Sequence, residues 1–200
     1  MSRGLRADAE RSVRAILEAA ERVLADEPGA SLEQIAEEAG LTRTTVHRRF
    51  ANRQALVDAL AVSAKQQLAE AIDEARPDAA PALVAMYRVT ANVLRTKSAW
   101  RFTLGNPLAD TSAATAIWAE ITARTLELLA RAQREGVLDP AADLEWTRQV
   151  YYALLSEALH RPGRDQGPDA QDPDVLATLV IDTLLHGAGP RGSARASDEA

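Results

Sequence analysis

Apolar residues along this chain recur three and four positions apart, a spacing that places them on one face of an α-helix. The first such face is formed by Val13, Ile16, Leu17, Ala20, Val23 and Leu24. A second, shorter face is formed by Leu32, Ile35, Ala36 and Ala39. No segment shows the sustained alternation of apolar and polar residues that is typical of a half-buried strand. The pattern therefore predicts an all-α protein.

Turn and capping residues indicate where the first predicted helices end. Pro28–Gly29 ends the first helix. Ser31 is a predicted N-cap, and Gln34 three residues later completes a capping box. Gly40 stands where a helix commonly ends in a left-handed residue, and Thr42 is a predicted N-cap for a short third helix. These signals predict two short helices joined by a tight turn.

The rest of the chain is also predicted to be mainly helical. A fourth helix covers about residues 54–75 and ends before Pro77. Later helices are predicted over residues 82–96, 111–134, 143–160 and 174–186, with a short or broken helix within residues 100–110. Residues 161–173 are rich in proline, glycine and aspartate and predict a mobile loop, and residues 187–200 predict a disordered tail.

A basic cluster coincides with the predicted turn and third helix. Residues 42–53 contain four arginines and no acid, although the chain carries a net charge of −6. Ala36, Gly40 and Val46 supply the small, turn-forming and apolar side chains with which two helices pack closely. This packing leaves an outward face on the second helix, formed by Arg43, Thr44, His47 and Arg48. Pattern and charge together favour a DNA-reading helix over an ordinary helical hairpin whose arginines are only solvated.

Composition and motifs limit the other classes of function. The chain has no cysteine, which excludes disulfides and thiolate metal sites. The histidines, His47, His160 and His186, form no His-Glu-x-x-His motif, and neither a glycine-rich phosphate loop nor a Gly-x-Ser-x-Gly motif is present. No apolar run approaches the roughly 20 residues of a membrane span, and the N-terminus lacks an apolar signal core. We therefore expect a cytoplasmic protein without metal or cofactor, and not an enzyme.

The segment around the basic cluster also carries a family resemblance. Residues 39–56 read Ala-Gly-Leu-Thr-Arg-Thr-Thr-Val-His-Arg-Arg-Phe-Ala-Asn-Arg-Gln-Ala-Leu. With their surroundings, residues 11–60, they resemble the N-terminal domain of the TetR family of bacterial transcriptional regulators. That family runs roughly Ala-Gly-Val-Ser-x-Gly/Pro-Thr-Leu-Tyr-x-His-Phe-x-x-Lys-x-x-Leu. Two residues depart from the pattern: His47 stands where tyrosine is usual and Arg53 where lysine is usual.

The resemblance implies DNA-binding roles for the matching residues. Those expected to hold phosphates are Thr42, Thr45, His47 and Arg53. Arg43 and Thr44 would reach base edges, where arginine most often reads guanine, and Arg48 could do either. Arg3 and Arg6 could follow a minor groove from a flexible arm, or belong to a disordered end.

The resemblance also implies a division of the chain into four parts. These are a flexible arm (residues 1–9), a helix–turn–helix DNA-binding domain (10–55), a regulatory helical bundle (56–187) and a disordered tail (188–200). The bundle would hold a small effector, and its last two helices would pair with their copies in a homodimer. The apolar stripe expected to form that contact is Val175, Leu176, Leu179, Val180, Thr183 and Leu184.

Aromatic residues are the candidates for effector binding. Those expected to contact the ligand are Tyr87, Trp100, Phe102, Trp118 and Tyr151. A hydrophobic core is the competing interpretation for each of them. Tyr151 and Tyr152 are about 100° apart on a helix, so only one of the two is expected to face the interior.

The sequence thus predicts a homodimeric, ligand-responsive regulator, a repressor released from a palindromic operator in double-stranded DNA by an unidentified small-molecule effector. Two alternatives stay open. One is a constitutive DNA-binding protein without an effector. The other is a helical-bundle enzyme or scaffold that does not bind DNA.

Overall fold

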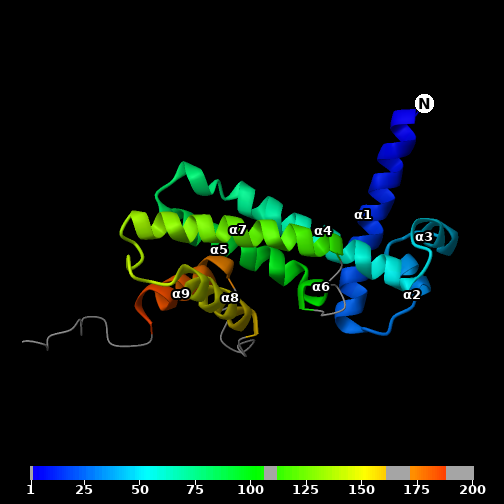
Figure 1. The fold of residues 1–200 in the computed structure, drawn as a ribbon. Helices are drawn as coiled ribbons and strands as arrows, with labels where there is room; N and C mark the ends of the chain where they lie inside the picture. The colour runs from blue at the N-terminus through cyan, green and yellow to red at the C-terminus, as the bar shows by residue number, and fades with distance from the viewer. Residues whose placement is uncertain (1, 106–111, 161–171, 188–200) are drawn as a thin grey trace, which may run out of the picture. The chain divides into compact units, whose positions relative to one another are not determined.

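The computed structural model describes residues 2–105, 112–160 and 172–187, and all regular structure within these residues is helical (Figure 1). The elements are α1 (Ser2–Asp26), α2 (Leu32–Glu38), α3 (Arg43–Arg49), α4 (Arg53–Glu74), the 3-10 helix η1 (Pro77–Ala79), α5 (Ala82–Ala99), α6 (Arg101–Gly105), α7 (Ser112–Arg134), α8 (Leu144–His160) and α9 (Pro173–His186). The prediction of an all-α chain, with a short helix after residue 100, is confirmed.

Two of the predicted irregular segments can be compared with the structure only in part. The predicted tail and most of the predicted loop after residue 160 lie outside the described residues. At the other end, α1 begins at Ser2, so residues 2–9 are helical. Five of these eight residues are alanine, leucine or arginine, which are strong helix formers. The side chains of Arg3 and Arg6 are outside the described part.

The chain forms two compact units. The first consists of Met1–Glu70 with Thr96–Ile121, and the second of Ala71–Arg95 with Thr122–Ala200. Helices α4, α5 and α7 therefore contribute residues to both units. The four-part division expected from the sequence stays a prediction.

The first unit has a core built from the apolar faces of its helices. Its buried members are Ile16, Leu17, Ala20, Leu24, Ala30, Leu32, Ile35, Ala36, Val46, Phe50, Leu56, Leu60, Ala64 and Trp100. These positions include most of the periodic residues that predicted the first two helices, and the others, Val13, Val23 and Ala39, are partly buried against this core. Phe50, the C-cap of α3, is buried here, so its ring packs inside the unit and is not available for DNA contact.

A buried carboxylate joins α1 to α6 within this unit. Glu21 accepts hydrogen bonds from the backbone N–H of Phe102 (2.6 Å) and of Thr103 (3.2 Å), and from the Thr103 hydroxyl. The first N–H groups of a helix have no partner within it, so this carboxylate caps α6 from another helix. Burial raises the pKa of Glu21, although the Thr103 hydroxyl, the two N–H groups and the charge of Arg101 each act to lower it.

The second unit buries one face of α9 against its neighbours. The buried residues of that face are Leu176, Ala177, Val180 and Ile181. Tyr151 of α8 is buried in this unit, whereas Tyr152 is only half-buried and donates its hydroxyl to Thr125 (3.1 Å). The inference that these neighbouring tyrosines cannot share a face is confirmed.

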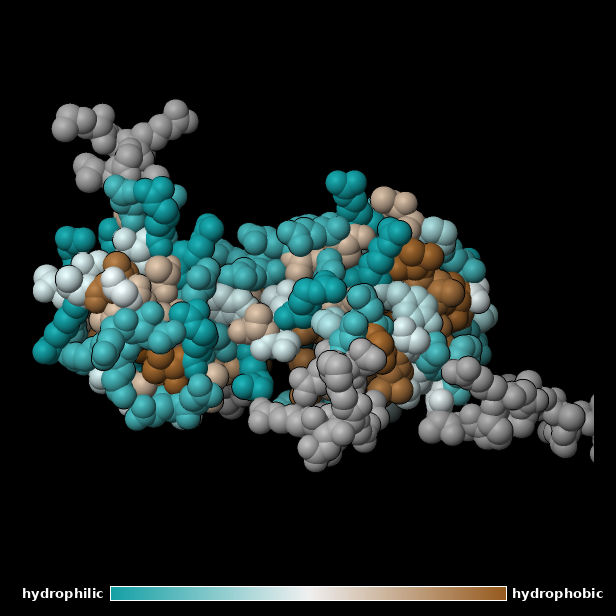
Figure 2. Space-filling model, turned by 180° about the vertical axis from the view of Figure 1, so that it is seen from behind, coloured by the Kyte–Doolittle hydropathy of each residue, from teal (hydrophilic) through white to brown (hydrophobic). Residues whose placement is uncertain are grey.

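Large apolar side chains also reach the surface. Those of the second unit are Leu83, Val84, Trp146, Val175 and Leu179. Figure 2 shows apolar patches, in brown, on a surface that is otherwise largely polar. Among the described residues, no helix combines the length and the apolar character needed to cross a membrane.

Candidate nucleic-acid interface

The turn between α2 and α3 has the geometry that its sequence predicts. Gly40 adopts a left-handed conformation (φ 64°) directly after the end of α2. Its N–H donates to Glu37 O (3.0 Å), and the N–H of Leu41 donates to Ala36 O (2.9 Å). This pair of bonds is a Schellman motif, which satisfies the last carbonyls of a helix. The turn therefore closes with its backbone groups paired, and α3 begins two residues later.

Side-chain caps fix the start of each of the two helices. Ser31 Oγ accepts from Gln34 N (3.2 Å), and Gln34 Oε1 accepts from Ser31 N (2.7 Å), which completes the predicted capping box. Thr42 Oγ1 accepts from Thr45 N (3.2 Å) and lies 2.9 Å from Thr45 Oγ1. Both predicted caps are confirmed. The two threonines expected to hold phosphates therefore already bond each other.

Val46 determines which face of α3 is outward. Its side chain is fully buried in the core of the first unit. Because residues on a helix are about 100° apart, burial of Val46 turns the other side of α3 to the solvent. The exposed residues of α3 and its cap are Thr42, Arg43, Thr44, His47 and Arg48. The structure thus brings five of the seven predicted DNA contacts onto one exposed surface, with Thr45 half-buried beside them.

An acidic residue that the sequence interpretation missed lies against this surface. Glu33 of α2 places Oε1 2.8 Å from Arg43 Nε and 3.6 Å from His47 Nε2. Arg43 Nε also donates to His47 Nε2 at 3.5 Å. The pKa of Glu33 is lowered, first by a hydrogen bond from its own backbone N–H and then by the charge of Arg43. No spacing rule could have found this cluster, because its members come from two different helices.

Arg53, the remaining predicted phosphate ligand, is engaged elsewhere in the first unit. Its guanidinium donates through Nη1 to Ala30 O and through Nη2 to Pro28 O. Both carbonyls belong to the connection between α1 and α2. Arg53 therefore links the start of α4 to that connection, a contact absent from the sequence interpretation. Its role toward a phosphate stays a prediction.

The five aromatic candidates for ligand binding are divided between the units. Trp100, Phe102 and Trp118 belong to the first unit, and Tyr87 and Tyr151 to the second. Trp100 is buried in the core of the first unit and donates Nε1–H to Gln67 Oε1 (3.1 Å), and Phe102 is partly buried against that core. The Trp118 side chain is 37% exposed on α7.

The two tyrosines are held by polar partners in the second unit. Tyr87 donates its hydroxyl to Asp182 of α9 (2.7 Å). Thr90 Oγ1 donates to Met86 O (2.6 Å), so the Tyr151 hydroxyl, 2.9 Å away, donates to Thr90 Oγ1 in turn. Burial raises the pKa of the Tyr151 phenol.

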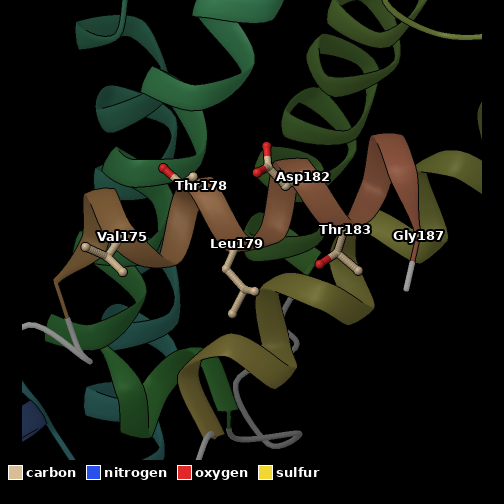
Figure 3. Close-up of a pocket in the computed structure, with 6 residues that line it drawn as sticks. All are labelled: Val175, Thr178, Leu179, Asp182, Thr183 and Gly187. Atoms are coloured by element: carbon tan, nitrogen blue, oxygen red, sulfur yellow. The ribbon is translucent and has the colours of Figure 1, made fainter. Parts of the chain in front are cut away.

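The exposed side of α9 has a shallow hollow of about 410 Å³ (Figure 3). Its lining residues are Val175, Thr178, Leu179, Asp182, Thr183 and Gly187. Val175 and Leu179 are 52% and 41% exposed, whereas Leu176 and Val180 of the same predicted stripe are buried. The broad apolar stripe is therefore divided into an inner half that closes the core and an outer half at the surface.

The fold of the first unit and the exposed residues of α3 are typical of a helix–turn–helix DNA-binding protein. Residues 16–60 match the model of the bacterial regulatory proteins of the tetR family. Over 177 residues the chain is 35% identical to the HTH-type transcriptional repressor LfrR of Mycolicibacterium smegmatis, a match that covers 88% of this chain and 92% of the relative. The chain belongs to the TetR family of bacterial regulatory proteins.

Solved structures show the same relationship. The TetR-like transcriptional regulator LfrR from Mycobacterium smegmatis, in complex with proflavine, has a TM-score of 0.73 and 32% sequence identity, covering 90% of this chain and 98% of that chain. The regulator FadR from Bacillus subtilis, in complex with stearoyl-CoA, has a TM-score of 0.68 at 18% identity, covering 88% and 99%, and shares the fold. Membership of this family makes the protein a transcriptional regulator and not an enzyme.

Proposed function

We propose that the protein is a homodimeric repressor that binds a palindromic operator through α3 and is released from DNA by a small-molecule effector. One observation carries the DNA-binding part of this proposal. An acidic chain presents Arg43, His47 and Arg48, all exposed, on a short helix that the fully buried Val46 anchors in the core. This is the arrangement with which a recognition helix enters a major groove.

The polar side chains of this face divide into two roles. Arg43 and Thr44, at the start of α3, contact base edges, and Arg48 contacts a base or a phosphate. His47, Arg53 and the hydroxyls of Thr42 and Thr45 contact phosphates, which position the helix without reading sequence. The protein acts in the cytoplasm, where bacterial operators are found.

Two features of α9 support the proposed homodimer through the last two helices. Val175 and Leu179 expose apolar surface on α9, and both line the hollow on that helix. Closed two-fold dimers bury the same patch of both subunits, and an exposed apolar patch is typical of such a contact. Two recognition helices related in this way bind half-sites about one helical turn, roughly 34 Å, apart.

The effector part of the proposal rests on the relatives. A related regulator, LfrR, has been solved with proflavine bound. The residues that we propose for ligand contact here are Tyr87, Trp100, Phe102, Trp118 and Tyr151. An effector releases DNA only if it binds the DNA-free state more tightly than the DNA-bound state.

The experiment that tests DNA binding starts from the purified full chain and random-sequence duplexes. Selection and sequencing should give a palindromic site, and footprinting should show its protection by a dimer. Arg48→Ala should weaken binding to this site, whereas Arg134→Ala, which removes an exposed arginine of the second unit, should not. Equal binding to all sequences would contradict the operator, and no binding to DNA would contradict the function.

Titration of the operator complex tests effector release. Proflavine and a panel of other planar cations and acyl-CoA esters are added to the complex, and release is followed by fluorescence anisotropy. A releasing compound should lose potency with Trp118→Ala while the DNA affinity of that variant changes little. A complex that no compound dissociates would favour the constitutive DNA-binding protein.

A further inference from the structure

Two proposed DNA contacts on α3 share one acidic partner on α2. The Glu33 carboxylate lies 2.8 Å from Arg43 Nε and 3.6 Å from His47 Nε2. All three side chains are open to solvent, with exposed fractions of 44% for Glu33, 69% for Arg43 and 40% for His47. Ion pairs as exposed as this contribute little to folding stability, so stability alone does not account for the cluster.

We propose that Glu33 is a positioning residue for Arg43 that increases discrimination between DNA sequences at the expense of affinity. This inference rests on the proposed DNA-binding role of α3. The two effects come from the same carboxylate and have different physical causes.

The positioning effect follows from the geometry of the guanidinium. Arginine reads guanine by donating two parallel N–H bonds to O6 and N7, which demands one orientation of a long, flexible side chain. Glu33 contacts Arg43 at Nε, and the two terminal nitrogens remain as donors toward a base. If Glu33 already orders the guanidinium before DNA binds, the Arg43 side chain loses less conformational entropy on binding.

The effect on affinity follows from charge. A carboxylate beside the phosphate contacts repels the DNA backbone whatever its sequence, because that backbone carries the dominant negative charge. Glu33 also competes with phosphates for Arg43 and for His47. Binding to random sequence is therefore penalised, and the penalty is offset where Arg43 finds its base pair.

Glu33→Gln separates these effects because it keeps the size of the side chain and removes its charge. The matched control is Glu37→Gln, which removes an exposed charge one turn further along α2. Affinities are measured at fixed salt for three duplexes: the selected operator, the operator changed at the base pair that Arg43→Ala identifies, and a random sequence. Thermal unfolding of each variant checks that the fold is retained.

Glu33→Gln should bind random DNA several-fold more tightly than wild type, and its preference for the correct base pair should fall by about five- to tenfold, the lower part of what one bidentate contact provides. Glu37→Gln should strengthen random binding by a similar or smaller factor and leave the preference unchanged. In an Arg43→Ala background, Glu33→Gln should no longer alter the preference.

The outcomes distinguish this inference from the function on which it rests. If wild type prefers its operator and Glu33→Gln retains the full preference, the positioning role is wrong and the DNA-binding role stands. The same holds if Glu33→Gln alters the preference equally with and without Arg43. If wild type shows no sequence preference, the operator proposal fails, and the role of Glu33 fails with it.

Discussion

Glu21 and Thr103 are 82 positions apart in the sequence, yet the Glu21 carboxylate accepts from both the backbone N–H and the hydroxyl of Thr103. This contact joins α1, which carries part of the helix–turn–helix core, to the short helix α6. A buried acid in this position makes the stability of the first unit depend on pH.

The direction of that dependence follows from the raised pKa of Glu21. Its contribution to stability is fully present below the usual value of 4.5 and is lost as the pH rises through the raised pKa, because the folded state then holds an ionised, buried carboxylate. The urea midpoint of wild type, relative to that of Glu21→Gln, should therefore fall between pH 4.5 and pH 7.5. Glu18→Gln, an exposed change on the same helix, should follow wild type. If the urea midpoints of wild type and Glu21→Gln changed in parallel with pH, the raised pKa of Glu21 would be contradicted.

Arg53 should matter for folding as well as for DNA. Arg53→Ala removes the donor to Pro28 O and Ala30 O and should lower stability by about 1–3 kcal/mol. Arg53→Lys keeps the charge, but an ammonium cannot reproduce the planar fork, so part of this loss should remain. Chemical unfolding checks both variants. If stability were unchanged while the salt dependence of DNA binding fell by about one unit per half-site, Arg53 would be a phosphate ligand only.

The outer half of α9 should control assembly. Val175→Glu combined with Leu179→Glu places two charges on the apolar surface proposed for the dimer, and should give monomers with weak operator binding. Leu83→Glu, at an exposed leucine of α5, serves as the control and should leave the dimer intact. Sedimentation velocity measures both. A dimer that persists in the double variant would move the interface away from α9.

The features that could be predicted from sequence are those encoded within a few residues. The Ser31–Gln34 capping box, the left-handed Gly40 and the Thr42 cap each depend on neighbours at most four positions away. Apolar periodicity likewise predicted the helices, because burial repeats with the helical turn. Together these local signals determine the outward face of α3.

The contacts that could not be predicted join residues distant in sequence. Glu33 meets Arg43 only because α2 and α3 cross, and Arg53 reaches carbonyls 23 and 25 positions earlier. Periodicity also could not divide the stripe on α9, since inner and outer apolar residues differ only in what packs against them. Charge patterning indicated a basic surface and gave no sign of the acid beside it.

Gly40 adopts a left-handed backbone conformation that L-amino acids with a side chain rarely adopt. Space is available there, because a methyl group added at Gly40 would meet no atom within 4 Å, and the restriction lies in the positive φ alone. L-Alanine at this position would therefore strain the backbone, whereas its mirror image, D-alanine, prefers that conformation. In a chain assembled by chemical ligation, D-alanine at residue 40 would restrict the unfolded chain, stiffen the link between α2 and α3, and leave every contact of the turn in place.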